Sequence, residues 1–285
     1  MRIMRDKRKS RFLKLIILVG IVVCLAPIVQ AYCLSLQHEA QTERLKDMVE
    51  MSAEYAEPEI VNETDSSYDE DENFPADFST DNFPSESVPV EETPSVLSKY
   101  TALYEENGDL AGWLSIADTE IDYPVMQNED DNYYLHHDFY GEESKYGCLY
   151  VREQADLDAG TNFIIYGHNM KDGSMFGDLD LYLNESFYKE HSTISFDTLY
   201  EERTYEIISV FLSQVYGEED DVFKYYQFYK ADTREEFEYF YSNIKELSLY
   251  DTGVEAAFGD TFLTLSTCAY HVEDGRFVVV AKRIK

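Results

Sequence analysis

Alternating or β-branched apolar residues recur in short runs over the C-terminal two-thirds of the chain, separated by polar connections. This alternation is the pattern of a strand with one buried face, and β-branched residues favour strands. The pattern predicts eight strands, at Gly112–Ile116, Glu120–Met126, Gly147–Val151, Asn162–Tyr166, Thr193–Phe196, Thr204–Val215, Thr261–Ser266 and Arg276–Ile284. So many short strands in one region predict a mainly β domain, either an antiparallel barrel or a sandwich.

Three segments have the three- and four-residue spacing of helices instead. A helix that enters the domain is predicted at residues 98–106, and a short helical pair is predicted at residues 176–189. The third segment, residues 232–248, has Asp232 or Thr233 as candidate N-cap, followed by apolar residues at Phe237, Phe240, Tyr241, Ile244 and Leu247. Because these helices are insertions between strands and do not alternate with them, the sequence disfavours a Rossmann fold.

The N-terminal part follows a different pattern. Residues 1–14 hold seven basic residues and one acid, and residues 15–36 are 22 residues without a charge. At about 1.5 Å per residue, a helix of that length measures roughly 33 Å and can cross a hydrocarbon core of about 30 Å. The basic cluster predicts a cytoplasmic head, so residues 15–36 are predicted to be a transmembrane signal-anchor with the rest of the chain outside. A cleaved signal peptide ending near Val29-Gln30-Ala31 is the alternative, although the apolar run is longer than such peptides need.

Residues 37–96 are acidic and contain proline and serine; from residue 39 they hold 18 acids, two bases and five prolines. This composition predicts a largely disordered stalk, whose first part, to about residue 56, could continue the membrane helix for a few turns. Residues 97–285 then form the folded domain. The formal charge of the whole chain is −34, which repels phosphate backbones and excludes nucleic acid as a partner. Its four cysteines are too few for a disulfide framework.

Three side chains at predicted strand ends form a candidate acyl-transfer site. Cys268 ends one strand, and Arg276 opens the next, eight residues later, so a hairpin would bring the two side by side. His168 follows another strand end. A nearby cation favours the thiolate that acts as nucleophile, and an arginine can also bind the oxyanion of an acyl-transfer intermediate. By spacing alone, a buried cysteine, a capping histidine and a surface arginine explain the pattern equally well.

The sequence around these residues resembles class B sortases. The two signature segments are YGHNMKDGSMF at Tyr166–Phe176 and LTLSTC at Leu263–Cys268. Four further segments are similar to the family in the same order, at Gly112–Ile116, Ile121–Gln127, Tyr133–Phe139 and Arg276–Ala281. The resemblance covers residues 97–285, and the long insertion with its helix before the cysteine strand is also typical of class B.

The resemblance implies an eight-stranded β-barrel with peripheral helices, acting as a transpeptidase of the Gram-positive cell surface. Cys268 would attack the backbone carbonyl of a sorting-signal Thr near the C-terminus of a secreted protein. His168 would act as general acid and base, and Arg276 would stabilise the oxyanion and orient the peptide. An amine of a cell-wall precursor would resolve the thioacyl-enzyme, and neither a metal nor a cofactor is expected.

Several neighbouring residues have competing interpretations. His271 lies three residues after Cys268, but His168 occupies the position of the family motif and is preferred as the base. Cys148 is interpreted as a buried small side chain, with a regulatory disulfide to Cys268 as the alternative. The residues predicted to contact the peptide are Ser266 and Thr267, from their place before the nucleophile, and Phe223 and Tyr226, as an aromatic wall; structural core explains the two rings equally well.

Three classes of function remain open from the sequence. The first is a transpeptidase, which joins secreted proteins to peptidoglycan or, in a variant, polymerises pilin through a lysine amine. The second is a cysteine protease that releases a hydrolysed product. The third is a non-catalytic adhesin or scaffold, which would have no need to keep Cys268, His168 and Arg276 together.

Overall fold

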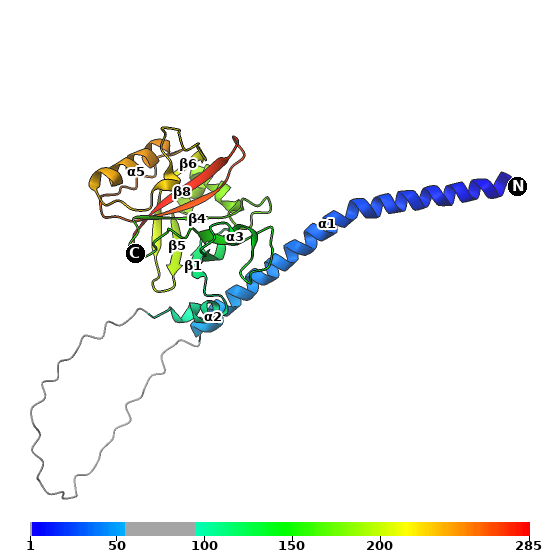
Figure 1. Ribbon diagram of the computed structural model, residues 1–285, viewed down its shortest axis with the longest axis horizontal. Coiled ribbons are helices and arrows are strands. Elements are labelled where there is room, and N and C mark those ends of the chain that lie inside the picture. The colour runs from blue at the N-terminus through cyan, green and yellow to red at the C-terminus, as the bar shows by residue number, and fades with distance from the viewer. Residues whose placement is uncertain (1, 55–94) are drawn as a thin grey trace, which may run out of the picture.

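The computed structural model describes the backbone of residues 2–54 and 95–285, and the side chains of residues 23–54 and 95–285. It consists of a β-barrel with short helices around it and one long N-terminal helix that leaves the barrel on one side (Figure 1).

Eight strands close into a barrel, as the sequence predicts. They are β1 Leu110–Ser115, β2 Asp122–Gln127, β3 Leu149–Val151, β4 Asn162–Tyr166, β5 Thr193–Thr198, β6 Thr204–Gln214, β7 Phe262–Cys268 and β8 Gly275–Arg283. Around the barrel their order is β1-β2-β3-β4-β7-β8-β6-β5, and β5 pairs with β1 to close it.

The barrel is mixed, so the expectation of an antiparallel architecture is wrong. Strand β2 pairs with β3 in parallel, and β4 pairs with β7 in parallel, whereas the other junctions are antiparallel. A parallel pair needs a crossover between its strands. Residues 128–148 supply the first crossover, and the segment from residue 167 to 261, which carries β5 and β6, supplies the second.

Both faces of the central strands are buried, which explains their nearly continuous apolar runs. Ile165, Leu265 and Val279 belong to the cluster that fills the barrel. Their neighbours on the other face pack under the helix α5, Arg234–Leu247, through its residues Phe237, Phe240 and Ile244. The remaining short elements are α2 Ser98–Glu106, α3 Tyr133–His136, α4 Glu185–Glu190 and the 3-10 turns η1 Gly177–Leu183 and η2 Tyr225–Gln227.

The predicted helices are present, and two short elements were not predicted. The expected helix over residues 98–106 is α2, the expected helical pair is η1 with α4, and α5 lies within the predicted 232–248. α3 and η2 were missed because an element of four or three residues is shorter than the repeat by which helices are recognised in a sequence.

Thr233 caps α5 through a reciprocal pair of hydrogen bonds. Its Oγ1 accepts from the Glu236 backbone N–H at 3.2 Å, and the Glu236 carboxylate accepts from the Thr233 N–H at 3.0 Å. We expect Thr233→Ala to lower the free energy of unfolding by about 1 kcal/mol, because a backbone donor of the first turn loses its partner. Urea unfolding would measure the change, and Thr233→Ser should retain most of the stability. Equal stability of the alanine variant and the parent would contradict this role.

The N-terminal helix α1, Arg2–Glu54, continues through residues that the sequence assigned to the stalk. Its C-terminal part, residues 38–54, packs on the domain beside α2 (Figure 1): Leu45 is buried in a cluster with Leu103 and Trp113. Gln41 Nε2 donates to Asp138 Oδ2 at 3.0 Å, and Lys46 pairs with Asp122 at 3.2 Å. Residues 37–54 therefore belong structurally to the domain.

The predicted anchor and head lie largely outside the described side chains. In the predicted anchor, residues 15–36, the structure describes side chains from residue 23 onward. The side chains of the predicted head, residues 1–14, lie outside the described residues. Residues 55–94 of the predicted stalk lie outside them as well. Within the described residues, no helix has the length and apolar character needed to cross a membrane.

We expect His38 to make the stability of the docked α1 sensitive to pH. Its ring stacks on that of Tyr146, with the ring centroids 4.0 Å apart. Burial lowers the pKa of His38 below the usual 6.5, and Lys145 lowers it slightly further. Asp172 and Asp138 act in the opposite direction but do not offset the burial. The neutral ring is therefore favoured in the folded chain, whereas the unfolded chain takes up the proton. We expect the stabilisation that the neutral ring provides to be complete above about pH 6.5 and to be lost as pH falls below that value.

Thermal unfolding between pH 7.5 and 5.5 would measure this loss. His38→Phe keeps an aromatic ring for stacking but cannot titrate, so its melting temperature should fall less over the same range. A parallel fall in both proteins would show that other groups cause the pH dependence.

Candidate active site

Strands β7 and β8 place Cys268 beside Arg276, as the hairpin spacing predicts. The two residues are direct partners in the antiparallel register. Cys268 is the last residue of β7 and is exposed, and the Ala269 N–H donates to the Gly275 carbonyl at 2.9 Å, which continues the pairing beyond the strand end. The thiol thus stands at the rim of the barrel, open to solvent.

His168 reaches the same rim from the neighbouring strand β4. Tyr166 is in register with Ser266, and the chain continues in step, because the Gly167 N–H donates to the Ser266 carbonyl at 3.3 Å. Thr267 Oγ1 also donates to the Gly167 carbonyl, at 2.8 Å. Since β4 and β7 run parallel, the residues that follow their matched ends lie next to one another. His168 and Cys268 are therefore neighbours on adjacent chain segments.

The imidazole of His168 is held by a main-chain carbonyl that the sequence did not reveal. Its Nε2 lies 2.8 Å from the Leu135 oxygen. A carbonyl can only accept, so Nε2 carries a proton, and Nδ1 is the nitrogen of the neutral ring that is available to exchange one. Leu135 lies in α3, one of the two short elements that the sequence pattern did not predict. A backbone acceptor has no counterpart in the pattern of side chains, so this hydrogen bond could not be predicted either.

The Arg276 guanidinium is held by the backbone of its own turn. Its Nη1 donates to the carbonyls of Asp274 and Gly275 at 3.2 and 2.9 Å. Among the ion pairs of the described residues, none involves Arg276. An arginine whose charge is not matched by a carboxylate can direct its remaining donors at a developing negative charge.

The other candidate residues near the thiol have structural positions. His271 is exposed in the turn between β7 and β8. Cys148 is a buried free thiol whose pKa is raised by that burial, which favours the interpretation as a small core side chain over a disulfide with Cys268. A buried thiol with a raised pKa is poorly reactive.

Of the four residues predicted to contact the peptide, Phe223 and Tyr226 are partly exposed. Ser266 and Thr267 are buried, and the Ser266 hydroxyl lies 2.7 Å from that of Tyr225, which is also buried. Phe223 packs on Phe240 of α5, and the Tyr226 hydroxyl accepts from the Tyr216 N–H at 2.9 Å. Peptide contact by these four residues stays a prediction, and Tyr225 is a neighbour of the site that the sequence did not single out.

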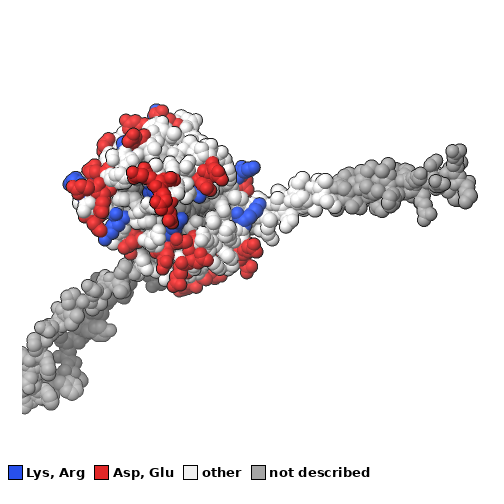
Figure 2. Space-filling view, turned by 45° about the horizontal axis from the view of Figure 1, so that its top comes forward, with Lys and Arg blue, Asp and Glu red and all other residues white. Residues whose placement is uncertain are grey.

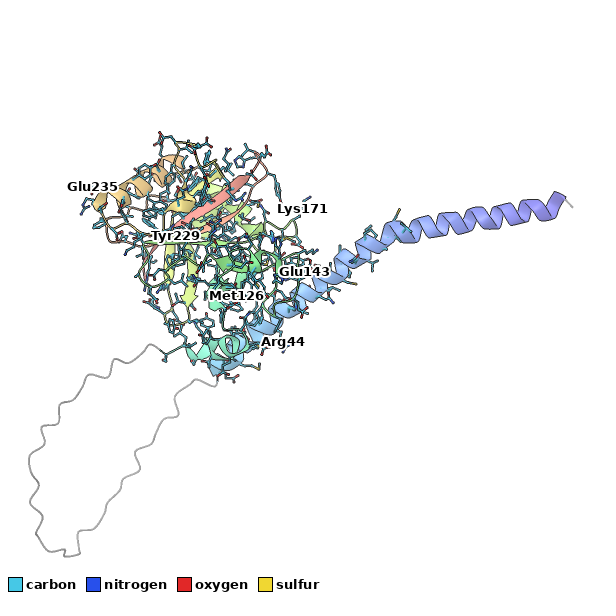
Figure 3. All side chains as sticks on the ribbon, in the orientation of Figure 1. Arg44, Met126, Glu143, Lys171, Tyr229 and Glu235 are labelled. Carbon is cyan, nitrogen blue, oxygen red and sulfur yellow. The ribbon has the colours of Figure 1, made fainter. Side chains whose placement is uncertain are left out.

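The loop after His168 also contacts the N-terminal helix. Asp172 and Ser174 lie with His38 and Thr42 around one surface pocket. Lys171, in the same loop, stands at the edge of the domain on the side from which α1 leaves (Figure 3). On the face of the domain shown in Figure 2, Asp and Glu cover more of the surface than Lys and Arg do.

Comparison with known proteins agrees with this fold. The family profile described as the sortase domain matches residues 114–284. Sortase B of Listeria monocytogenes is 38% identical over 187 residues, which are 64% of this chain and 72% of that protein. Sortase B of Staphylococcus aureus is 31% identical over 193 residues, 67% of this chain and 76% of that protein.

Solved structures give the same result. A sortase B–substrate complex of Staphylococcus aureus superposes with a TM-score of 0.67 at 25% identity, covering 88% of this chain and 98% of that one. Sortase B from Bacillus anthracis in complex with AAEK1 gives a TM-score of 0.59 at 36% identity, covering 67% and 86%. The chain belongs to the sortase family, in its Sortase B group, and is therefore a cysteine transpeptidase. The resemblance inferred from the sequence motifs is confirmed.

Proposed function

We propose that this transpeptidase cleaves a C-terminal sorting signal of secreted proteins and transfers the acyl part to an amine of a cell-wall precursor. The observation that carries the assignment of residues is the exposed Cys268, directly opposite Arg276 in the register and adjacent to the His168 segment.

In the first half-reaction the Cys268 thiol gives its proton to Nδ1 of His168, and the sulfur attacks the carbonyl carbon of the sorting-signal Thr. Arg276 donates to the resulting oxyanion. The C–N bond then breaks, His168 gives its proton to the departing amine, and a thioacyl-enzyme remains. In the second half-reaction His168 takes a proton from the incoming amine, whose nitrogen attacks the thioester. The C–S bond breaks as the new amide forms, and His168 returns the proton to the Cys268 sulfur, which restores the thiol.

We further propose that residues 15–36 anchor the enzyme in the cell membrane, with the catalytic domain outside. The support is the uncharged run of 22 residues after seven basic residues. In cells, the full chain should stay with the membrane fraction after a high-salt wash, and external protease should digest the domain. Release of the domain into the medium would instead favour the cleaved signal peptide.

Transpeptidation is tested with a peptide library built around Asn-Pro-x-Thr-x, with and without amines. Two amines separate the acceptor types: a cell-wall stem peptide with a free amine, and a pilin-like peptide with one lysine. Mass spectrometry should detect a ligated product with the stem peptide that is absent without enzyme. Ligation to the pilin-like peptide alone would favour pilin polymerisation. Hydrolysis at the same rate with and without both amines would favour a cysteine protease, and the absence of any cleavage would favour a scaffold.

A further inference from the structure

Asn169, the residue after His168, connects the histidine segment to the nucleophile. Its Nδ2 donates to the main-chain carbonyl of Cys268 at 2.9 Å. The same nitrogen faces the carboxylate of Asp180 in η1, at 3.4 Å from Oδ1 and 3.3 Å from Oδ2. An amide nitrogen has two protons, so one hydrogen bond to each partner is satisfied.

The hydrogen bond from the Asn169 side chain to the Cys268 carbonyl takes the place of the next backbone hydrogen bond between β4 and β7. In the parallel ladder the Gly167 N–H donates to the Ser266 carbonyl, and two residues further the backbone of residue 169 would donate to the carbonyl of Cys268. The chain bends away before that point: the His168 carbonyl accepts from the Phe176 N–H at 2.9 Å, and Asn169 pairs with Met175. The side-chain amide supplies the donor that the backbone no longer provides.

Asp180 and the Cys268 carbonyl select the same orientation of the Asn169 amide. A carboxylate accepts hydrogen bonds only, so it attracts the NH2 group and turns the amide oxygen away. The Cys268 carbonyl accepts as well, so both partners select the same orientation of the side chain.

We infer that Asn169 is a positioning residue of the transpeptidase, which holds the tip of β7 at a fixed distance from His168, and that Asp180 orients it. This inference rests on the proposed roles of Cys268 and His168. The hydrogen bond from Thr267 to the Gly167 carbonyl does not involve Asn169, so we expect the strand ends to stay paired one residue earlier when Asn169 is changed. The loss of Asn169 therefore affects the geometry of the reacting groups more than the stability of the barrel.

Asn169→Ala is expected to lower kcat about 10- to 100-fold, because small misplacements of reacting groups have effects of that order. The KM for the sorting peptide should change by less than about threefold, since the inferred role is to hold the reacting groups and not the peptide. Asn243→Ala is the matched control: Asn243, on α5, also donates from Nδ2 to a main-chain carbonyl, that of Tyr239 at 2.7 Å. The control should keep the activity of the parent, and melting temperatures should be compared for both variants.

Asn169→Asp provides a readout that a purely structural role would not give. An ionised aspartate has no proton to donate and repels Asp180, so this variant should be as impaired as the alanine variant at pH 7.5. A protonated aspartate regains an O–H donor, so the ratio of its activity to that of the parent should rise as pH falls toward about 5. Because the side chain has nearly the same shape, this variant decides the question even if the alanine variant does not fold.

The outcomes separate this inference from the proposed function. Parent-like kcat in the alanine variant, or an activity ratio of the aspartate variant that does not change with pH, would overturn the positioning role while Cys268→Ala remained inactive. Ligated product formed by Cys268→Ala would instead overturn the proposed site.

Discussion

Cys268→Ala is expected to abolish both the ligated product and the thioacyl adduct, with a loss of activity of about 10³-fold or more. The physical reason is that the covalent intermediate needs an accessible thiol: of the two cysteines in residues 95–285, Cys268 is exposed, whereas Cys148 is buried with a raised pKa. Mass spectrometry of the enzyme incubated with the sorting peptide and no amine should detect the adduct in the parent only.

Cys148→Ala is the matched control for this experiment. The same substitution in the core removes a small buried side chain, so it should lower the melting temperature while the adduct still forms. An adduct on the Cys268→Ala variant, or its loss in the Cys148→Ala variant with the fold intact, would contradict the assignment of the nucleophile.

Arg276→Ala is expected to lower kcat about 10²- to 10³-fold, the range for loss of one preorganised oxyanion donor. Arg276 is next to the nucleophile in the register, and the carbonyls of its own turn hold one of its nitrogens. Arg276→Lys keeps the charge but lacks the planar fork of donors, so its activity should lie between those of the parent and the alanine variant.

Arg283→Ala tests whether these effects arise from the site or from β8 as a whole. Arg283 ends the same strand at the opposite end of the barrel, where it pairs with Glu201. Its loss should reduce stability modestly and leave kcat near that of the parent. If both arginine variants lost kcat equally, Arg276 would have no specific role in the chemistry.

Local patterns in the sequence predicted the strands and the three candidate catalytic residues. Each of the eight expected runs contains an observed strand or most of one, because alternation and β-branching are properties of a few neighbouring residues. The proximity of Cys268 and Arg276 also follows from local information, since a hairpin joins them. The family motifs then identified His168 as their neighbour.

These local patterns did not predict which strands pair when the strands are far apart in the sequence. The parallel junction of β4 and β7 joins Tyr166 to Ser266, residues a hundred positions apart, and an apolar run does not encode the direction of its partner. The bond from His168 to the Leu135 carbonyl was equally hidden, because every residue except proline has the same backbone groups. The docking of α1 was missed because Leu45 is a single buried leucine among charged residues.

The docked C-terminal part of α1, residues 38–54, bears on where the enzyme would work. Helix α1 ends at Glu54 beside α2, which begins at Ser98, so the two ends of the acidic stretch between them lie on the same side of the domain. The separation of a membrane anchor from the barrel would therefore be set by α1 and not by the length of that stretch. His38 is the first residue of α1 with a stacking contact to the barrel, and it follows the predicted anchor by two residues, roughly 3 Å of helix. An anchor at residues 15–36 would thus hold the barrel against the lipid headgroups, so that only signals presented at the bilayer surface, and amines on carriers within that layer, would come within range of Cys268.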